Sequence, residues 1–205
     1  MSDWQALLEF WFGELVEGFA DDAHRHQWFT PNAEFDVRCR ELFGASLASA
    51  AKGDLTDWLD APKSCLAYIL VCDQIPRNIY RGTKDAFATD ELALNAARHG
   101  IENGFDQALA WDERSFFYMP FEHSESIVDQ HTAVGLFSAS RDASPKSARD
   151  ILGNQLRFAH QHRDIILKFG RFPHRNHLFG RASSAAEEAF VAAGDGFGQN
   201  IDDAN

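Results

Sequence analysis

Apolar residues recur at helical spacing along most of the chain, and this pattern limits the fold more than any other feature. The first stripe, within residues 3–18, consists of Trp4, Leu7, Leu8, Trp11, Phe12 and Leu15. A second follows the N-cap and proline pair Thr30-Pro31 and consists of Phe35, Cys39, Leu42, Phe43 and Leu47. No segment sustains the period-two alternation of a half-buried strand. The sequence therefore predicts an all-α fold of about eight helices in antiparallel pairs.

Caps, glycines and prolines predict the other helix boundaries. Beyond Gly53, which ends the second helix, we expect helices from Asp60-Ala61-Pro62 to Pro76, Thr89 or Asp90 to Asn103, Asp112 to Pro120, Ser124 to Ser140, and Ser144-Pro145 to Gly170. Ser184 and Glu187 form a capping box for a short last helix closed by Gly194. We expect one domain over residues 1–197 and a frayed tail over residues 198–205.

Composition favours a globular protein that works without nucleic acid or membrane. The 205 residues are 45% apolar and carry a formal charge of −12, so we expect repulsion from nucleic acids and anionic lipid. No apolar run approaches 18 residues, and the N-terminus does not resemble a signal peptide. Cys39, Cys65 and Cys72 form no metal or redox motif. We expect buried free thiols and a cytoplasmic location.

Some polar residues occupy positions that should face the core. Asp73 continues the stripe of Leu66, Ile69 and Leu70, so its carboxylate needs a partner. Arg77, four residues later, is one candidate, and Arg81 or an arginine of residues 171–175 is another. In the long helix the stripe predicted to be buried runs Ile151, Gln155, Phe158, His162, Ile165 and Phe169. His162 is therefore either a core residue with its hydrogen bonds satisfied, or a base or metal ligand.

Three carboxylates fall on one face if residues 122–133 are helical: Glu122, Glu125 and Asp129. They could form a solvated acidic face, pair with Arg77, Arg171 or Arg175, or bind a hard metal ion. Common metal, hydrolase, nucleotide and dinucleotide motifs are not found, and we expect no metal and no cofactor.

The segment Gly170–Asn176 places two arginines, a histidine and an asparagine around Phe172-Pro173. Gly170 is predicted to cap the long helix and Pro173 to prevent its continuation. These side chains should be held at a defined helix end, with Asp73, Glu122 and Glu125 as acidic partners. A buried salt-bridge network and a binding site are both compatible with the pattern.

A set of motifs occurs in order along the chain: Phe10–Gly13, Trp28-Phe29, Asp73–Gly82, Phe87–Asp90, Tyr118–Glu125, His162–Ile166 and Gly170–Asn176. With these motifs the chain closely resembles, over residues 5–197, the bacterial domain of unknown function 924 family. It implies a TPR-like helical bundle or short solenoid and no established activity. The chain lacks the TPR consensus of tryptophan, glycine and tyrosine, which argues against ordinary peptide binding in a groove.

The leading functional hypothesis is a site for a small molecule, such as an anion, or for acid–base chemistry. Its candidate residues, expected to converge at one end of the bundle, are Asp73, Arg77, Asn78, Glu122, His123, Glu125, Asp129, His162, Arg171, His174, Arg175 and Asn176. One alternative is a scaffold for a protein or peptide partner, which predicts that Trp4, Trp11 or Trp28 is accessible. The other is a metal-dependent hydrolase that uses Glu122, Glu125 and Asp129 with His123 or His162. The oligomeric state is not predicted.

Overall fold

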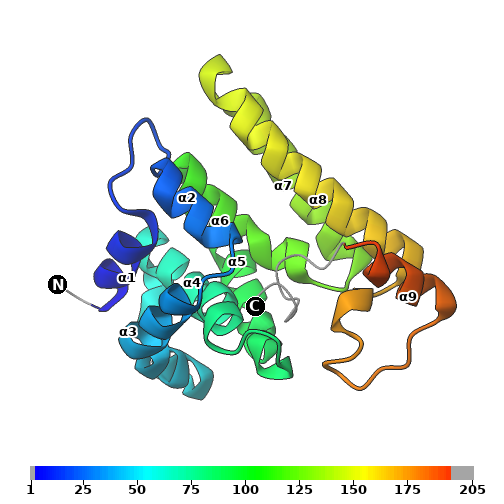
Figure 1. Cartoon of the computed structure of the whole chain (residues 1–205). Coiled ribbons are helices and arrows are strands. Elements are labelled where there is room, and N and C mark those ends of the chain that lie inside the picture. Colours follow the sequence, from blue (N-terminus) through cyan, green and yellow to red (C-terminus); the bar gives the residue numbers. More distant parts are fainter. Residues whose placement is uncertain (1–2, 195–205) are drawn as a thin grey trace. The chain divides into compact units, whose positions relative to one another are not determined.

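The computed structural model describes residues 3–194, and this part of the chain is all-α, as predicted (Figure 1). It contains nine α-helices, against about eight expected: α1 (Asp3–Phe12), α2 (Asp22–Phe29), α3 (Ala33–Lys52), α4 (Pro62–Ile79), α5 (Asp90–Glu102), α6 (Trp111–His123), α7 (Ile127–Ala143), α8 (Arg149–Phe169) and α9 (Ala185–Ala192). No β-strand is present among these residues, apart from a single bridge between Val16 and Phe19. The expected tail at 198–205 lies outside the described residues.

The described chain divides into two compact units, residues 3–117 and residues 118–194. The expectation of one domain over residues 1–197, and that of a TPR-like arrangement, stay predictions. None of the helices in the described range is long and apolar enough to cross a bilayer.

Helix α4 forms the centre of the first unit, where α1, α3 and α5 pack against it (Figure 1). Every residue from Ser64 to Arg77 is buried, which is typical of a helix enclosed on all sides. The three cysteines are buried and free, as expected. An aromatic cluster adds to this core: Trp28 lies with its ring 4.7 Å from that of Phe116, and its indole N–H donates to the Trp11 carbonyl at 2.8 Å.

The expectation that Pro76 ends this helix is wrong, because α4 continues to Ile79. A proline cannot donate to the carbonyl four residues earlier, here that of Cys72. The Thr89 hydroxyl donates to this carbonyl instead, at 2.6 Å. The replacement bond satisfies an otherwise unpaired buried oxygen, so the helix tolerates the proline. Helix α6 likewise continues past Pro120 to His123.

Other boundaries differ from expectation for local reasons. Helix α1 ends at Phe12 because Gly13 adopts φ 59°, a left-handed conformation, so the predicted helix does not reach residue 18. Helix α2 was not predicted from the sequence, because it buries none of its residues and therefore has no apolar stripe. Asn32 rather than Thr30 caps α3, through its side-chain oxygen and the Phe35 N–H.

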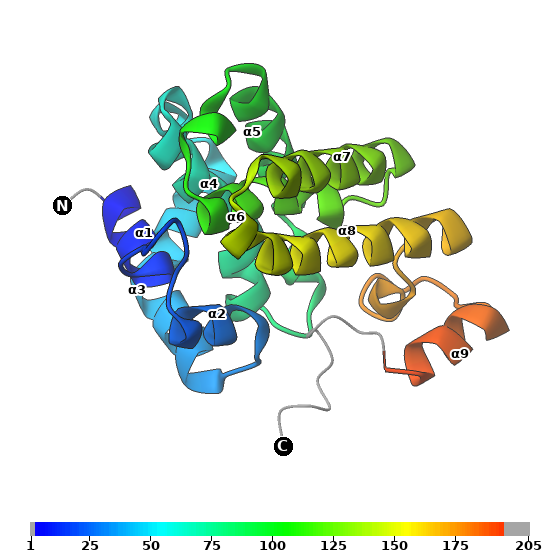
Figure 2. The same cartoon turned by 90° about the horizontal axis from the view of Figure 1, so that it is seen from above.

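In the second unit, α7 and α8 lie side by side (Figures 1 and 2). The buried face of α8 differs from the predicted stripe, of which only His162 and Ile165 are buried; its other buried residues are Leu152, Leu156, Ala159 and Ile166. Phe158 is 40% exposed and Gln155 is half-buried, so placing them in the core was wrong. Gly170 caps α8 with φ 70°, and Ser184 and Glu187 form the predicted capping box of α9.

Candidate functional site

The first unit holds three of the predicted site residues, Asp73, Arg77 and Asn78, at the end of α4. Arg77 lies 3.2 Å from Asp73, which confirms the predicted i,i+4 pair, and it also binds Asp90 at the start of α5 with both terminal nitrogens, at 2.9 and 3.1 Å. Asn78 donates to the Gln74 carbonyl at 3.0 Å and accepts from Arg81 at 3.0 Å. These contacts tie the end of α4 to α5, a structural role. That these residues join the others in one site stays a prediction.

The second unit holds the other nine predicted residues, beginning with a buried pair of Glu122 and His162. Glu122 lies in the last turn of α6, and its Oε1 is 2.8 Å from Nδ1 of His162 on α8. The side chains are 6% and 10% exposed. Nδ1 also lies 3.0 Å from the Phe158 carbonyl oxygen. Both neighbours are acceptors when Glu122 is ionised, so Nδ1 carries the proton and the Nε2 of a neutral imidazole carries the lone pair.

Gln130, in the first turns of α7, holds the end of α6 in place. It is fully buried, and its side-chain amide donates to the carbonyls of Glu122 and Ser124 at 2.6 and 2.7 Å. These carbonyls would otherwise be unsatisfied where the helix ends. The backbone that carries Glu122 and His123 is therefore fixed by a side chain that we did not include among the candidate site residues.

Three residues that follow α8 gather around His162. The Phe172 ring is fully buried, 5.6 Å from the His162 ring and 5.5 Å from the His174 ring. The Arg175 guanidinium lies 4.4 Å from the Phe172 centroid and donates to the His123 carbonyl at 3.0 Å. The His123 and His162 rings are 6.2 Å apart. The structure thus brings together Glu122, His123, His162, His174 and Arg175, which we call the His162 cluster.

His174 is electrically neutral within this cluster. It is 6% exposed, and burial of the imidazole, with a smaller effect of the Arg175 charge, lowers the pKa of His174 to about 3. At pH 7 its imidazole therefore offers one donor and one acceptor without a charge.

The three carboxylates at 122, 125 and 129 do not share a helical face, because α6 ends at His123 and α7 begins at Ile127. Each has a different partner: Glu122 contacts His162, Glu125 accepts from Arg181, and Asp129 accepts from Ser124 at 2.8 Å. The prediction that Ser124 caps the following helix is wrong, since its hydroxyl serves Asp129 and the Ser126 N–H. In the described part of the chain, no group of three or more His, Cys, Asp or Glu residues could hold a metal ion.

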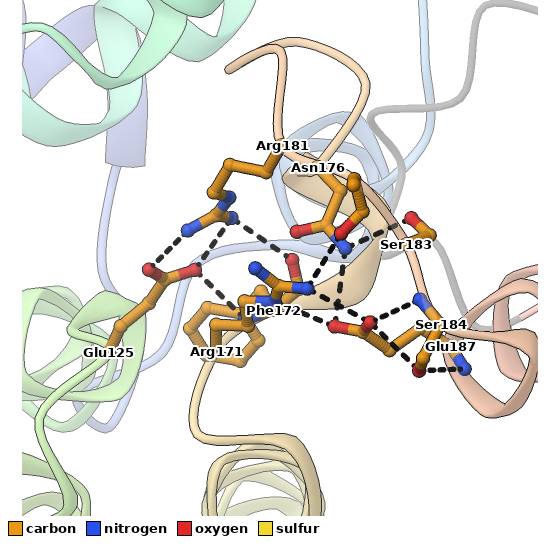
Figure 3. A network of polar contacts seen from close by, with 9 residues as sticks. Glu125, Arg171, Phe172, Asn176, Arg181, Ser183, Ser184 and Glu187 are labelled. Atoms are coloured by element: carbon orange, nitrogen blue, oxygen red, sulfur yellow. Dashed lines mark hydrogen bonds and ion pairs between the residues drawn. The ribbon is translucent and has the colours of Figure 1, made fainter.

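A network of arginines and carboxylates fixes the segment between α8 and α9 (Figure 3). Glu125 accepts from Arg181 at 2.7 and 3.0 Å and from the Phe172 N–H at 2.8 Å. Burial opposes ionisation of Glu125, but these hydrogen bonds outweigh it and lower its pKa. Arg171 binds Glu187 with two nitrogens, at 2.7 and 2.9 Å, and these bonds, helped by the Ser184 N–H, lower the pKa of Glu187.

The partners of Arg171 and Glu125 were therefore mispredicted. Arg171 pairs with Glu187 rather than with Glu122 or Glu125, and Arg181 was not among the candidates. Asn176, 1% exposed, donates to Ser183 and Glu187 at 3.0 and 3.2 Å. The sequence does repeat a glycine–arginine pair, Gly170-Arg171 and Gly180-Arg181, at the two ends of the segment. Both glycines adopt left-handed backbone angles, and the repeat could have indicated Arg181.

The fold and these contacts define an all-helical protein with a buried cluster of histidine, carboxylate and arginine side chains. The chain belongs to the family described as bacterial protein of unknown function (DUF924), whose model matches residues 7–195. It is similar to the solved structure of a protein of unknown function, ATU0120 from Agrobacterium tumefaciens, with 36% identity and a TM-score of 0.79 over 93% of this chain and 97% of that one. No curated protein matches the chain.

Proposed function

We propose that the protein binds a small anionic molecule beside the His162 cluster and that His162 acts on it as a general base or acid. The observation that carries the proposal is the buried contact of 2.8 Å between Glu122 Oε1 and His162 Nδ1. A carboxylate on Nδ1 orients the imidazole, which makes Nε2 the nitrogen that exchanges protons. Glu122 is thus the orienting residue and His162 the reacting one.

Positive charge near this pair supports an anionic ligand. Of the three arginines that follow α8, Arg171 and Arg181 are paired with Glu187 and Glu125, so the support comes from Arg175. Arg175 is buried and lies over the ring that also faces His162. Guanidinium groups bind carboxylate and phosphate through paired hydrogen bonds. Neutral His174 adds a donor and an acceptor that suit the uncharged part of such a ligand.

The two alternatives have less support. The scaffold hypothesis expects accessible tryptophans, but Trp11 is fully buried and Trp4 and Trp28 are each half-buried, so this expectation is met only in part. The hydrolase hypothesis needs carboxylates that converge on a metal ion, and the described carboxylates near His162 are directed to different partners.

The test is the thermal shift of the purified protein with inorganic phosphate, phosphate monoesters and small mono- and dicarboxylates. We expect at least one of these anions to raise the melting temperature of the wild type, and the His162→Asn variant to lose this shift. His131→Asn is the matched control, because His131 is exposed on α7 of the same unit. The proposal fails if none of the anions stabilises the wild type, or if His162→Asn keeps the full shift.

A further inference from the structure

The segment from Arg171 to Ser184, which we call the 171–184 loop, is a compact unit joined to the helices mainly through side chains. Backbone hydrogen bonds run within it, from Asn176 N–H to Pro173, from Phe179 N–H to Arg175 and from Arg181 N–H to Asn176. Such internal bonds let a loop move as one body when its attachments break.

One carboxylate holds both ends of this loop (Figure 3). Glu125, in the connection between α6 and α7, accepts from the Phe172 N–H at the loop's start and from Arg181 near its end, at 2.8, 2.7 and 3.0 Å. Arg181 also donates to the Phe172 carbonyl at 3.4 Å, which closes the loop on itself. Removal of the Glu125 carboxylate would therefore break one attachment at each end of the loop, while the Arg175 hydrogen bond to the His123 carbonyl remains.

The inner side of the loop covers His162. Phe172 is fully buried, its ring meets the His162 ring edge-on at an interplanar angle of 77°, and His174 and Arg175 lie against Phe172 in turn. The Glu125 and Arg181 side chains, by contrast, are 31% and 26% exposed. The attachment is thus at the surface, within reach of solvent and ions, while the group it covers is in the interior.

We propose that the 171–184 loop is a flap over His162 and that Glu125 is the positioning residue that keeps it shut. The role of the flap rests on the proposed function, in which His162 must meet a ligand although it is only 8% exposed. Closure excludes water from the reacting nitrogen, and opening admits the ligand, as in other enzymes with mobile loops. A charged pair that is partly exposed suits this purpose, because it can be broken at modest cost.

The test is the rate at which diethyl pyrocarbonate acylates each histidine of the whole chain at pH 7, measured by peptide mass spectrometry. Exposed His131 provides the internal reference rate. We expect Glu125→Ala to raise the relative rate at His162 about two- to fivefold, the range for loss of a partly exposed ion pair. Glu125→Gln should give a smaller rise, because its amide oxygen can still accept from the Phe172 N–H.

The control is Asp164→Ala, which removes an exposed carboxylate paired with Arg163 on α8 and should leave the rate at His162 unchanged. The salt dependence of the acylation rate distinguishes a flap held by an ion pair from a general structural role of Glu125. Raising NaCl from 0.05 to 0.5 M should speed acylation of His162 in the wild type by screening the pair, and should have little effect in Glu125→Ala. If Glu125→Ala does not fold, Arg181→Lys, which keeps the charge and loses the paired geometry, takes its place.

A folded Glu125→Ala or Arg181→Lys variant with the wild-type rate at His162 would overturn the flap, as would equal acceleration at every histidine. The measurement needs no ligand. If Glu125→Ala speeds acylation of His162 but no anion stabilises the wild type, the proposed function is contradicted and the flap is not.

Discussion

At the scale of single residues, His174 couples the His162 cluster to the stability of the protein. Its imidazole is buried beside the permanent charge of Arg175, so a second positive charge there is unfavourable. The folded state keeps His174 neutral down to about pH 3, whereas an unfolded histidine titrates near pH 6.5. Between these values the unfolded chain binds one proton more, and the contribution of His174 to stability falls as the pH falls.

We therefore expect the His174→Gln variant to lose stability less steeply than the wild type on acidification. The difference in slope should approach about 1.4 kcal/mol per pH unit below pH 6. Urea unfolding at pH 6.5, 5.5 and 4.5 measures it, with His131→Gln as the exposed control. Equal slopes for the wild type and His174→Gln would show that His174 takes up its proton in the folded state.

Gly100 is a second residue whose role depends on its neighbours. It lies in α5, and a Cβ added to it would collide with the Phe117 ring of α6 and contact the Cys65 sulfur at 3.4 Å. We expect Gly100→Ala to lower the free energy of unfolding by about 1–3 kcal/mol through overpacking. Gly44, in α3, has nothing within 4 Å of its Cβ position, so Gly44→Ala should stabilise by about 0.4–1 kcal/mol. Urea denaturation measures the free energy of unfolding of both variants and of the wild type. A Gly100→Ala variant as stable as the wild type would show that α5 and α6 can separate to admit the methyl group.

At the scale of helices, local sequence predicted the glycine C-caps and the α9 capping box, but not the helix ends that depend on tertiary contacts. Gly53 and Gly170 end their helices with left-handed backbone angles, and the α9 capping box forms between residues three apart. Pro76 misled the prediction because the hydroxyl that replaces its missing hydrogen bond comes from Thr89, thirteen residues away. The sequence shows where a proline removes a helical hydrogen bond, but not whether a distant side chain replaces that bond.

Helix α9 is short, and its cap should decide how firmly it anchors the 171–184 loop. The Ser184 side chain accepts from the Glu187 N–H, and Glu187 reaches back to the Ser184 N–H at 2.8 Å. We expect Ser184→Ala to destabilise α9 locally by about 1 kcal/mol. Amide hydrogen exchange of Ala185–Ala192 should accelerate severalfold, while that of α3 stays constant. Unchanged exchange in α9 would mean that the ion pair with Arg171 holds the helix without the cap.

At the scale of the whole molecule, the periodicity of apolar residues was sufficient to predict the fold class. The spacing of polar residues was not sufficient to predict which side chains of the site contact each other. All-α structure follows from the apolar stripes of α1, α3 and α4, which are regular enough to exclude strands. Site partners follow from which segments meet, and the Glu125–Arg181 pair joins residues 56 apart in sequence. His162 is buried as predicted because the predicted stripe overlaps the observed buried face of α8 at this position, although Phe158 of the same stripe is exposed. Its partner Glu122 was a candidate residue, but the contact itself needed the packing of α6 and α8.

The acidic net charge of the protein predicts that it does not bind nucleic acid. The arginine-rich 171–184 loop is where a local basic patch on this acidic chain could arise. Two of its arginines are neutralised in place, Arg171 by Glu187 and Arg181 by Glu125. With a formal charge of −12, the molecule should repel a polyanion at long range and offer little to bind it at short range.

We expect no change in fluorescence anisotropy of a labelled DNA duplex or RNA strand at 0.15 M NaCl, up to a protein concentration of about 10 μM. Binding that weakens as salt increases would contradict this, and its loss in Arg181→Ala would locate it in the loop.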